Sequence, residues 1–234
     1  MDYSALHAKL IELLELDSQR AYWVLDFGCG TGELLARIAK SISNESHLVG
    51  LDASEESISW ARQKHSGVEF QADKFIDTFD HPDASFDVIV SVDTLECVPD
   101  KEALLKEFVR LLKPKGRLLV AHWDWDTQVY HSAHKDVVRR VIASFADWQQ
   151  GWMDACDGQM GRKLWGLFEG SGLFRGEINS YTAIETDFSP GHYGYDRLSD
   201  VGELVGKGEF SKSDYDLLRA DLQSLHERGE YFYS

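Results

Sequence analysis

The chain has 234 residues, enough for one α/β domain with a sizeable core, and no apolar run approaches the roughly 20 residues of a membrane helix. Its 24 basic and 40 acidic side chains give a net charge of −16, and such a surface repels nucleic-acid phosphates and anionic lipid. We therefore predict a cytoplasmic protein that binds a neutral or cationic small molecule, and neither nucleic acid nor membranes. Three widely spaced cysteines indicate neither a disulfide framework nor a zinc site.

A short apolar segment and the glycine-rich loop after it, residues 23–32, organise the chain. The segment is apolar except for Asp26 and predicts a buried parallel strand. The glycines stand at alternate positions: Gly28, Gly30 and Gly32. They let the backbone turn sharply and approach a ligand closely. Residues 33–39 predict a helix whose free N–H groups face the loop. Strand, loop and helix together predict a site for a nucleotide-like ligand.

The string from Val24 to Gly32 resembles the first motif of class I S-adenosylmethionine-dependent methyltransferases. A dinucleotide site is the alternative, but its G-x-G-x-x-G pattern needs glycine at the position of Glu33, where a carboxylate would repel a pyrophosphate. Asp26 at the end of the strand is also typical of the methyltransferase motif. The resemblance implies S-adenosyl-L-methionine as the cofactor and S-adenosyl-L-homocysteine as its product.

Acidic residues also follow the next two predicted strands. Residues 47–52 predict a strand that ends in Asp52, and an acid at this tip can accept a hydrogen bond from each ribose hydroxyl. Asp52 could instead cap the next helix, a role that Ser54 could equally fill. Residues 68–71 predict the third strand. The resemblance implies that Asp73, just after it, bonds the adenine amino group.

Residues 86–91 predict the fourth strand, and the segment after it resembles the one that lines the methyl-transfer site in this family. That segment carries Asp93 and Glu96. Many relatives have histidine where this chain has Cys97, so a base at this position is not implied. Residues 116–121 predict the fifth strand.

A polar and aromatic string, residues 122–131, leaves the fifth strand on the side where ligands bind. Its W-D-x-D-T pattern, with the later G-R-x-L of residues 161–164, is similar to methyltransferases of the ubiquinone-biosynthesis type. The predicted catalytic residues are His122, Asp124 and His131. An imidazole can take a proton near neutral pH, and a carboxylate can orient it or hold a cationic acceptor. Each imidazole could instead be a structural hydrogen-bond partner. The predicted substrate-binding residues are Asp93, Glu96, Trp123, Trp125 and His134.

The resemblance assigns cofactor binding to the glycine loop and to the tips of the first four strands. The residues are Asp26, Gly28, Cys29, Gly30, Thr31, Gly32, Asp52, Ala53, Asp73, Lys74, Ser91 and Val92. Methyl transfer from a sulfonium is an in-line displacement, in which the protein mainly positions the acceptor and excludes water. The reaction needs no metal, and the His and Asp residues of 122–134 lack an established ligand spacing, so we predict no metal site.

These features predict an enzyme that transfers a methyl group to a nitrogen or oxygen of a small molecule, planar or cationic in character. Aromatic rings near the acceptor would stack on a flat ring or meet a cation. A non-catalytic binding or scaffold protein that keeps the fold is the alternative, and an NAD-dependent oxidoreductase is a third reading.

The remaining elements complete the predicted fold. Helices are predicted at residues 4–17, 55–64, 101–112, 135–148, 162–169 and 211–227, and further strands at 176–188 and 229–234. We predict an α/β, Rossmann-like, doubly wound fold with a mostly parallel seven-stranded sheet and helices on both faces. All 234 residues form a single domain in this prediction. An N-terminal helix lies in residues 1–20, the cofactor-binding core in 21–122, and a substrate lid in 123–175 and 189–210.

Overall fold

The computed structural model describes residues 4–74 and 78–234. The chain divides into two compact units. The sheet unit comprises His7–His122 and Leu164–Gly176, and the helical unit comprises Trp123–Lys163, Glu177–Ser234 and the described residues before His7. Residues 1–3, part of the predicted N-terminal segment, lie outside the described residues. The predicted single domain stays a prediction.

Five parallel strands form the sheet, in the order β3-β2-β1-β4-β5. They are β1 (Trp23–Phe27), β2 (His47–Asp52), β3 (Glu69–Ala72), β4 (Phe86–Val92) and β5 (Leu112–Ala121). The inner strands β1, β2 and β4 are mostly buried, as expected for parallel strands covered on both faces. β2 and β3 lie on one side of β1, and β4 and β5 lie on its other side, so the strand order reverses direction at β1. Open α/β sheets bind ligands at such a reversal, beyond the carboxyl ends of the strands.

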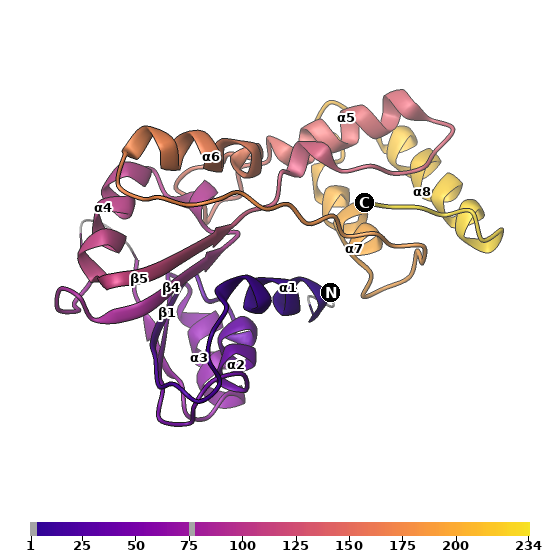
Figure 1. Cartoon of the computed structure of the whole chain (residues 1–234). Coiled ribbons are helices and arrows are strands. Elements are labelled where there is room, and N and C mark those ends of the chain that lie inside the picture. The colour runs from indigo at the N-terminus through magenta and orange to yellow at the C-terminus, as the bar shows by residue number, and fades with distance from the viewer. Residues whose placement is uncertain (1–3, 75–77) are drawn as a thin grey trace. The chain divides into compact units, whose positions relative to one another are not determined.

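Helices of the sheet unit connect successive strands. They are α2 (Glu33–Ala39), α3 (Glu55–Lys64) and α4 (Lys101–Leu111), with the short η1 (Leu95–Cys97) between β4 and α4. Right-handed crossovers place α2 and α3 on one face of the sheet and α4 on the other, because β4 lies on the opposite side of β1 from β2 (Figure 1). Leu104, Leu105 and Phe108 of α4 are fully buried. The predicted Rossmann-like α/β arrangement is therefore confirmed.

The helical unit has a core of its own. Its elements are η2 (Trp125–Thr127), α5 (Lys135–Ala146), α7 (Tyr193–Val201), η3 (Gly202–Leu204) and α8 (Lys212–Glu227). Two helices are shared between the units: α1 (Ser4–Leu14) and α6 (Met160–Ser171). The apolar faces of α5, α7 and α8 enclose aromatic rings, among them Tyr130, Phe188 and Tyr233. Ser211 and Asp214 form a capping box that begins α8.

The predicted count of seven strands is wrong for the residues that the structure describes, where the sheet has five. The predicted strands at 176–188 and 229–234 form only isolated antiparallel bridges, in which Tyr233 pairs with Glu185 and with Tyr130. The rings of Tyr231 and Tyr233 are buried in the helical core, and this packing takes the place of a ladder. In residues 176–188 the side chains of Ile178 and Ile184 are exposed, so the alternating apolar side chains of this segment do not all pack against a core.

Two boundaries also differ from the prediction. β5 begins at Leu112, which pairs with Phe86 before a register shift. The sequence predicts a later start, at residue 116, because proline and glycine follow the helix there. The lid predicted at 189–210 contains α7, which begins at Tyr193. The lid itself stays a prediction. Among the described residues, none of the helices has the length and apolar character needed to cross a membrane.

Asp26 is an acid in the middle of the sheet. It is 2% exposed in the central strand β1, between β2 and β4. Burial, with a smaller contribution from the charge of Asp52, raises the pKa of Asp26 from 3.8 to about 7. The folded protein therefore keeps this carboxyl protonated at pH values where the unfolded chain has lost the proton.

We expect Asp26 to make stability fall as pH rises. Between about pH 4 and 7 the unfolded state binds fewer protons at this residue, so the free energy of unfolding decreases there and levels off above the folded-state pKa. Asp26→Asn removes this dependence. The free energy of unfolding of the variant minus that of the wild type should therefore increase by about 3 kcal/mol from pH 5 to pH 8. Urea unfolding at both pH values measures the difference. Asp80→Asn, at an exposed acid, is the control, and parallel pH profiles of the wild type and Asp26→Asn would refute the assignment.

Candidate functional site

The glycine loop turns at the tip of β1 in a backbone conformation that favours glycine. Gly28, Gly30 and Gly32 have φ values of 77°, 51° and 78°. The N–H groups of Gly28 and Cys29 donate to the carbonyl of Leu51 at 2.8 and 3.0 Å, which fastens the loop to β2. Gly32 is the N-cap of α2 and has no side chain that would obstruct the helix N-terminus. No side chain caps the first turn of α2, so its first N–H groups keep their capacity to donate.

Asp52 fastens the same loop from its other side. One of its carboxylate oxygens accepts from the N–H of Gly30 and the other from the N–H of Ser54, each at 2.8 Å. The side-chain cap of α3 is Ser54, which accepts from Ser57, so the helix does not depend on Asp52 for its cap. Each Asp52 oxygen still has a lone pair with which it can accept a bond from a ligand hydroxyl.

The other predicted cofactor residues lie along the same edge of the sheet. Asp73 donates its N–H to the carbonyl of Asp52 at 2.9 Å, directly after β3, and its side chain is partly exposed. The hydroxyl of Ser91 is buried and donates to the carbonyl of Phe27 at 2.9 Å, so it ties β4 to β1. Their predicted contacts with a cofactor stay predictions.

Two charged or reactive groups near the loop have ordinary structural roles. Burial raises the pKa of the Cys29 thiol, with smaller contributions from Asp26 and Asp52, so the thiol stays neutral and is a poor nucleophile. Glu33, at the start of α2, forms an ion pair with Lys64, and this hydrogen bond lowers the pKa of the carboxyl. An ionised carboxylate therefore stands where a dinucleotide loop would need glycine.

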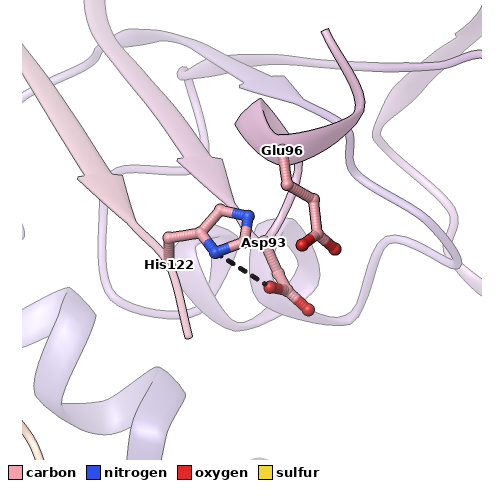
Figure 2. Close-up of side chains that lie close together, drawn as sticks. All are labelled: Asp93, Glu96 and His122. Carbon is pink, nitrogen blue, oxygen red and sulfur yellow. Dashed lines mark ion pairs between the residues drawn. The ribbon is translucent and has the colours of Figure 1, made fainter. Parts of the chain in front are cut away.

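Three predicted acceptor-site residues meet at the tips of β4 and β5. Val92 and Ala121 are partners in the parallel ladder, so the next residues, Asp93 and His122, leave the sheet side by side. The N–H of Asp93 donates to the carbonyl of Ala121 at 2.9 Å. His122 Nδ1 lies 3.5 Å from Asp93 Oδ1, and Glu96 approaches from η1 (Figure 2). We name Asp93, Glu96 and His122 the tip cluster.

The tip cluster is largely shielded from solvent. The side chain of His122 is 0% exposed and that of Asp93 31%, and Glu96 is 5% exposed. One ligand-type atom from each residue lies within 4.8 Å of the other two. The sequence predicts all three, with Asp124, around the acceptor at the tips of the fourth and fifth strands, and the structure brings Asp93, Glu96 and His122 together. The available signal was their position directly after two strands that become neighbours.

The predicted catalytic residue Asp124 lies in the helical unit and is held by α6. Its carboxylate accepts from the guanidinium of Arg162 through two bonds of 2.6 Å and from the Arg162 backbone N–H at 3.0 Å. A Cβ at Gly161 would lie 2.9 Å from Asp124, so the close approach needs glycine there. The W-D-x-D-T and G-R-x-L stretches are thus joined by this ion pair. The predicted acceptor role of Asp124 stays a prediction.

The remaining predicted residues are also engaged within the helical unit. His131 Nδ1 lies 3.0 Å from the carbonyl of Glu230, and the His134 N–H donates to the Ser132 hydroxyl at 3.0 Å. Trp125 is buried, and the ring of Trp123 packs against Tyr193 with centroids 5.0 Å apart. A hollow of about 130 Å³ adjoins Trp123; its lining includes Tyr181, Glu185 and Tyr193.

Comparison with known families decides what this arrangement is. Residues 18–172 match the family model described as a methyltransferase domain, which covers β1 to β5 and the glycine loop. The chain belongs to this methyltransferase family. The predicted resemblance to class I S-adenosylmethionine-dependent methyltransferases is confirmed by this match, and membership implies S-adenosylmethionine as the cofactor.

Curated relatives match part of this methyltransferase domain. Phosphoethanolamine N-methyltransferase 1 of Arabidopsis thaliana is 39% identical over 104 residues, which are 43% of this chain and 21% of the relative. Demethylmenaquinone methyltransferase of Lactobacillus johnsonii is 33% identical over 101 residues, 41% of each chain. The chain spans less than half the length of these relatives.

Solved structures support the fold over more of the chain. A candidate methyltransferase from Bacillus halodurans aligns with 91% of this chain and 88% of its own, at a TM-score of 0.58 and 16% identity. The [4+2]-cyclase SpnF aligns with 98% of this chain and 78% of its own, at a TM-score of 0.53 and 17% identity. Proteins with this fold thus include one that is named for a cyclisation, and fold alone does not establish the reaction.

Two loop glycines allow a matched test of the site. A Cβ at Gly28 would lie 1.9 Å from the hydroxyl oxygen of Thr94, a stiff β-branched side chain, whereas a Cβ at Gly30 meets nothing within 4 Å. Both alanine variants incur the left-handed backbone cost of about 1–2 kcal/mol. Gly28→Ala should lower the free energy of unfolding by at least about 1 kcal/mol more than Gly30→Ala, because of the added overlap. Urea unfolding measures this, and equal losses would contradict the observed loop conformation.

Proposed function

We propose that this protein transfers the methyl group of S-adenosylmethionine to a nitrogen or oxygen of a small molecule. The observation that carries the proposal is the glycine loop held between Leu51 and the Asp52 carboxylate, next to the N-terminus of α2, which no side chain caps. A Cβ at Gly30 would meet nothing within 4 Å, so a ligand can come close to the backbone there, whereas the glycines at 28 and 32 leave room for Thr94 and Phe70. The residues present therefore fit the cofactor that the family implies.

Each part of the cofactor has a proposed partner. The loop from Gly28 to Gly32, above Asp26, faces the amino-acid part, and Asp52 accepts from the ribose hydroxyls. Asp73 binds the adenine amino group. Proposed neighbours of these groups are Cys29, Thr31, Ala53, Lys74, Ser91 and Val92. When bound, S-adenosylmethionine supplies a methyl group on a positively charged sulfonium, which is already activated as a leaving group.

The acceptor is proposed to lie against the tip cluster. The proposed cofactor residues lie at the tips of β1, β2 and β3, so a bound cofactor would present its methyl group toward the tips of β4 and β5. Asp93 and Glu96 favour a cationic or hydrogen-bond-donating acceptor, and neutral His122 can accept a proton from it. The sequence-based roles of Asp124 and His131 as catalytic residues, and of Trp123, Trp125 and His134 as substrate-binding residues, stay part of this proposal. The name of the phosphoethanolamine relative states a nitrogen acceptor, which supports this acceptor class.

The proposal is tested by incubating the protein with S-adenosylmethionine that carries an isotope-labelled methyl group and with a pooled metabolite extract. Labelled product that depends on the protein supports methyl transfer. Calorimetry with S-adenosylhomocysteine and with NAD separates the cofactor readings, and binding of NAD alone would reject the proposal. Binding of S-adenosylhomocysteine with no labelled product across broad extracts would favour a scaffold or a different reaction, as the likeness to a cyclase illustrates.

Asp52→Ala should weaken binding of S-adenosylhomocysteine by about 1.5–3 kcal/mol, or roughly 10- to 150-fold in Kd, because it removes charge-assisted hydrogen bonds. The substitution also removes the acceptor of the Gly30 N–H, so the loop loses one of its hydrogen bonds to β2. Calorimetry measures the affinity. Glu56→Gln, which removes one charge from an exposed acid on α3, is the control and should bind as the wild type does. An Asp52→Ala variant that binds within twofold of the wild type would exclude the ribose role.

A further inference from the structure

The tip cluster combines three ligand types of side chain from three separate segments. Asp93 follows β4, Glu96 lies in η1 and His122 follows β5. Figure 2 shows the imidazole and the two carboxylates directed toward one another. The cluster therefore arises from strand register and from one short helical turn. The spacing of the three residues along the sequence does not match a known metal-ligand motif.

The geometry of the cluster suits a metal ion, which departs from the sequence-based prediction of no metal site. One donor atom from each residue lies within 4.8 Å of the other two, and the His122 Nδ1 to Asp93 Oδ1 distance is 3.5 Å. Metal–ligand bonds of about 2.0–2.2 Å in a tetrahedral site place ligand atoms about 3.3–3.6 Å apart. The ion pair already has this separation, and the third ligand atom, from Glu96, lies within 4.8 Å of the other two.

The charge of the cluster points to the same occupant. Two carboxylates with most of their surface removed from water repel each other and favour a nearby cation. A protonated imidazole offsets one negative charge, whereas a divalent ion offsets both and leaves the imidazole neutral, as a ligand must be. One nitrogen and two oxygen ligands suit a first-row ion, since imidazole prefers transition metals and carboxylates also bind Mn²⁺.

We propose that Asp93, Glu96 and His122 hold a divalent first-row cation, such as Mn²⁺ or Zn²⁺, and that an oxygen donor of the methyl acceptor occupies its open coordination position. Three protein ligands leave such a position, as in catalytic metal sites. The acceptor is then a molecule with a hydroxyl, carboxylate or phosphate oxygen near the methylated atom. This second half rests on the proposed function, whereas metal binding does not. While His122 ligates the ion it is not the proton acceptor, so metal dependence distinguishes its two roles.

The binding experiment uses the full chain, stripped of metal with a chelator, and Mn²⁺ alone as the probe. We expect one tightly bound Mn²⁺ per chain by electron paramagnetic resonance, displaced by Zn²⁺, with nitrogen couplings from His122. Glu96→Gln and Asp93→Asn should each weaken Mn²⁺ binding by at least about tenfold, since even the loss of a partner behind a ligand costs 10- to 100-fold. Asp93→Asn suits this test because asparagine tolerates the φ of 56° at this position. His122→Gln should remove the nitrogen couplings.

Glu102→Gln is the matched control, because it removes an exposed carboxylate from the first turn of α4. It should bind Mn²⁺ within twofold of the wild type, and thermal unfolding checks that each variant is folded. Mn²⁺ binding that is equal in the wild type, Glu96→Gln and Asp93→Asn would overturn the metal site and leave an ordinary ion pair between Asp93 and His122.

The role of the metal is tested separately from its binding. Labelled methyl transfer should fall at least about tenfold in chelator and return with Mn²⁺. Methyl transfer that is unchanged in chelator, yet lost in His122→Ala, would overturn the metal role and support His122 as the proton acceptor. Specific Mn²⁺ binding in a protein that transfers no methyl group would support the site and reject the proposed function.

Discussion

The hydrogen bond from the Gly30 N–H to the Asp52 carboxylate joins the two strands on which the candidate cofactor site depends. A loop with three positive-φ glycines would be mobile alone, since glycine has the largest conformational freedom to lose. Asp52 and the carbonyl of Leu51 hold it from β2, so the backbone is ordered before a ligand arrives. Preorganisation of this kind reduces the entropic cost of binding. The same carboxylate is thus a structural fastening of the loop and a proposed partner of the cofactor.

Burial of acidic groups near this loop has an energetic cost. Asp26 lies under the loop in the central strand, with its pKa raised by burial and by the charge of Asp52. A neutral carboxyl there limits the negative charge beside Asp52, which has to remain an acceptor. The two acids divide their roles by environment: one is buried in the sheet, and the other lies at its edge with two backbone N–H partners.

The second part of the site depends on strand register. Because β4 and β5 pair in parallel with Val92 opposite Ala121, Asp93 and His122 are placed together whatever their separation in the chain. Glu96 joins them because η1 turns the chain back at once after the strand. A shift of one residue in this ladder would separate the pair. The ion pair between Asp124 and Arg162 fastens the segment after His122 to the start of α6.

The sequence by itself determined β1, the glycine loop and α2, because each signal is local: an apolar run, alternate glycines and a helical segment. The acids after β2 and β3 followed from the same reasoning, since strand tips in a parallel sheet share one edge. Only the tertiary structure decided that Asp93, Glu96 and His122 form one cluster, because strand register is a long-range property. It also decided that residues 176–188 and 229–234 form single bridges instead of strands, because an alternating pattern becomes a strand only where a neighbour completes its ladder.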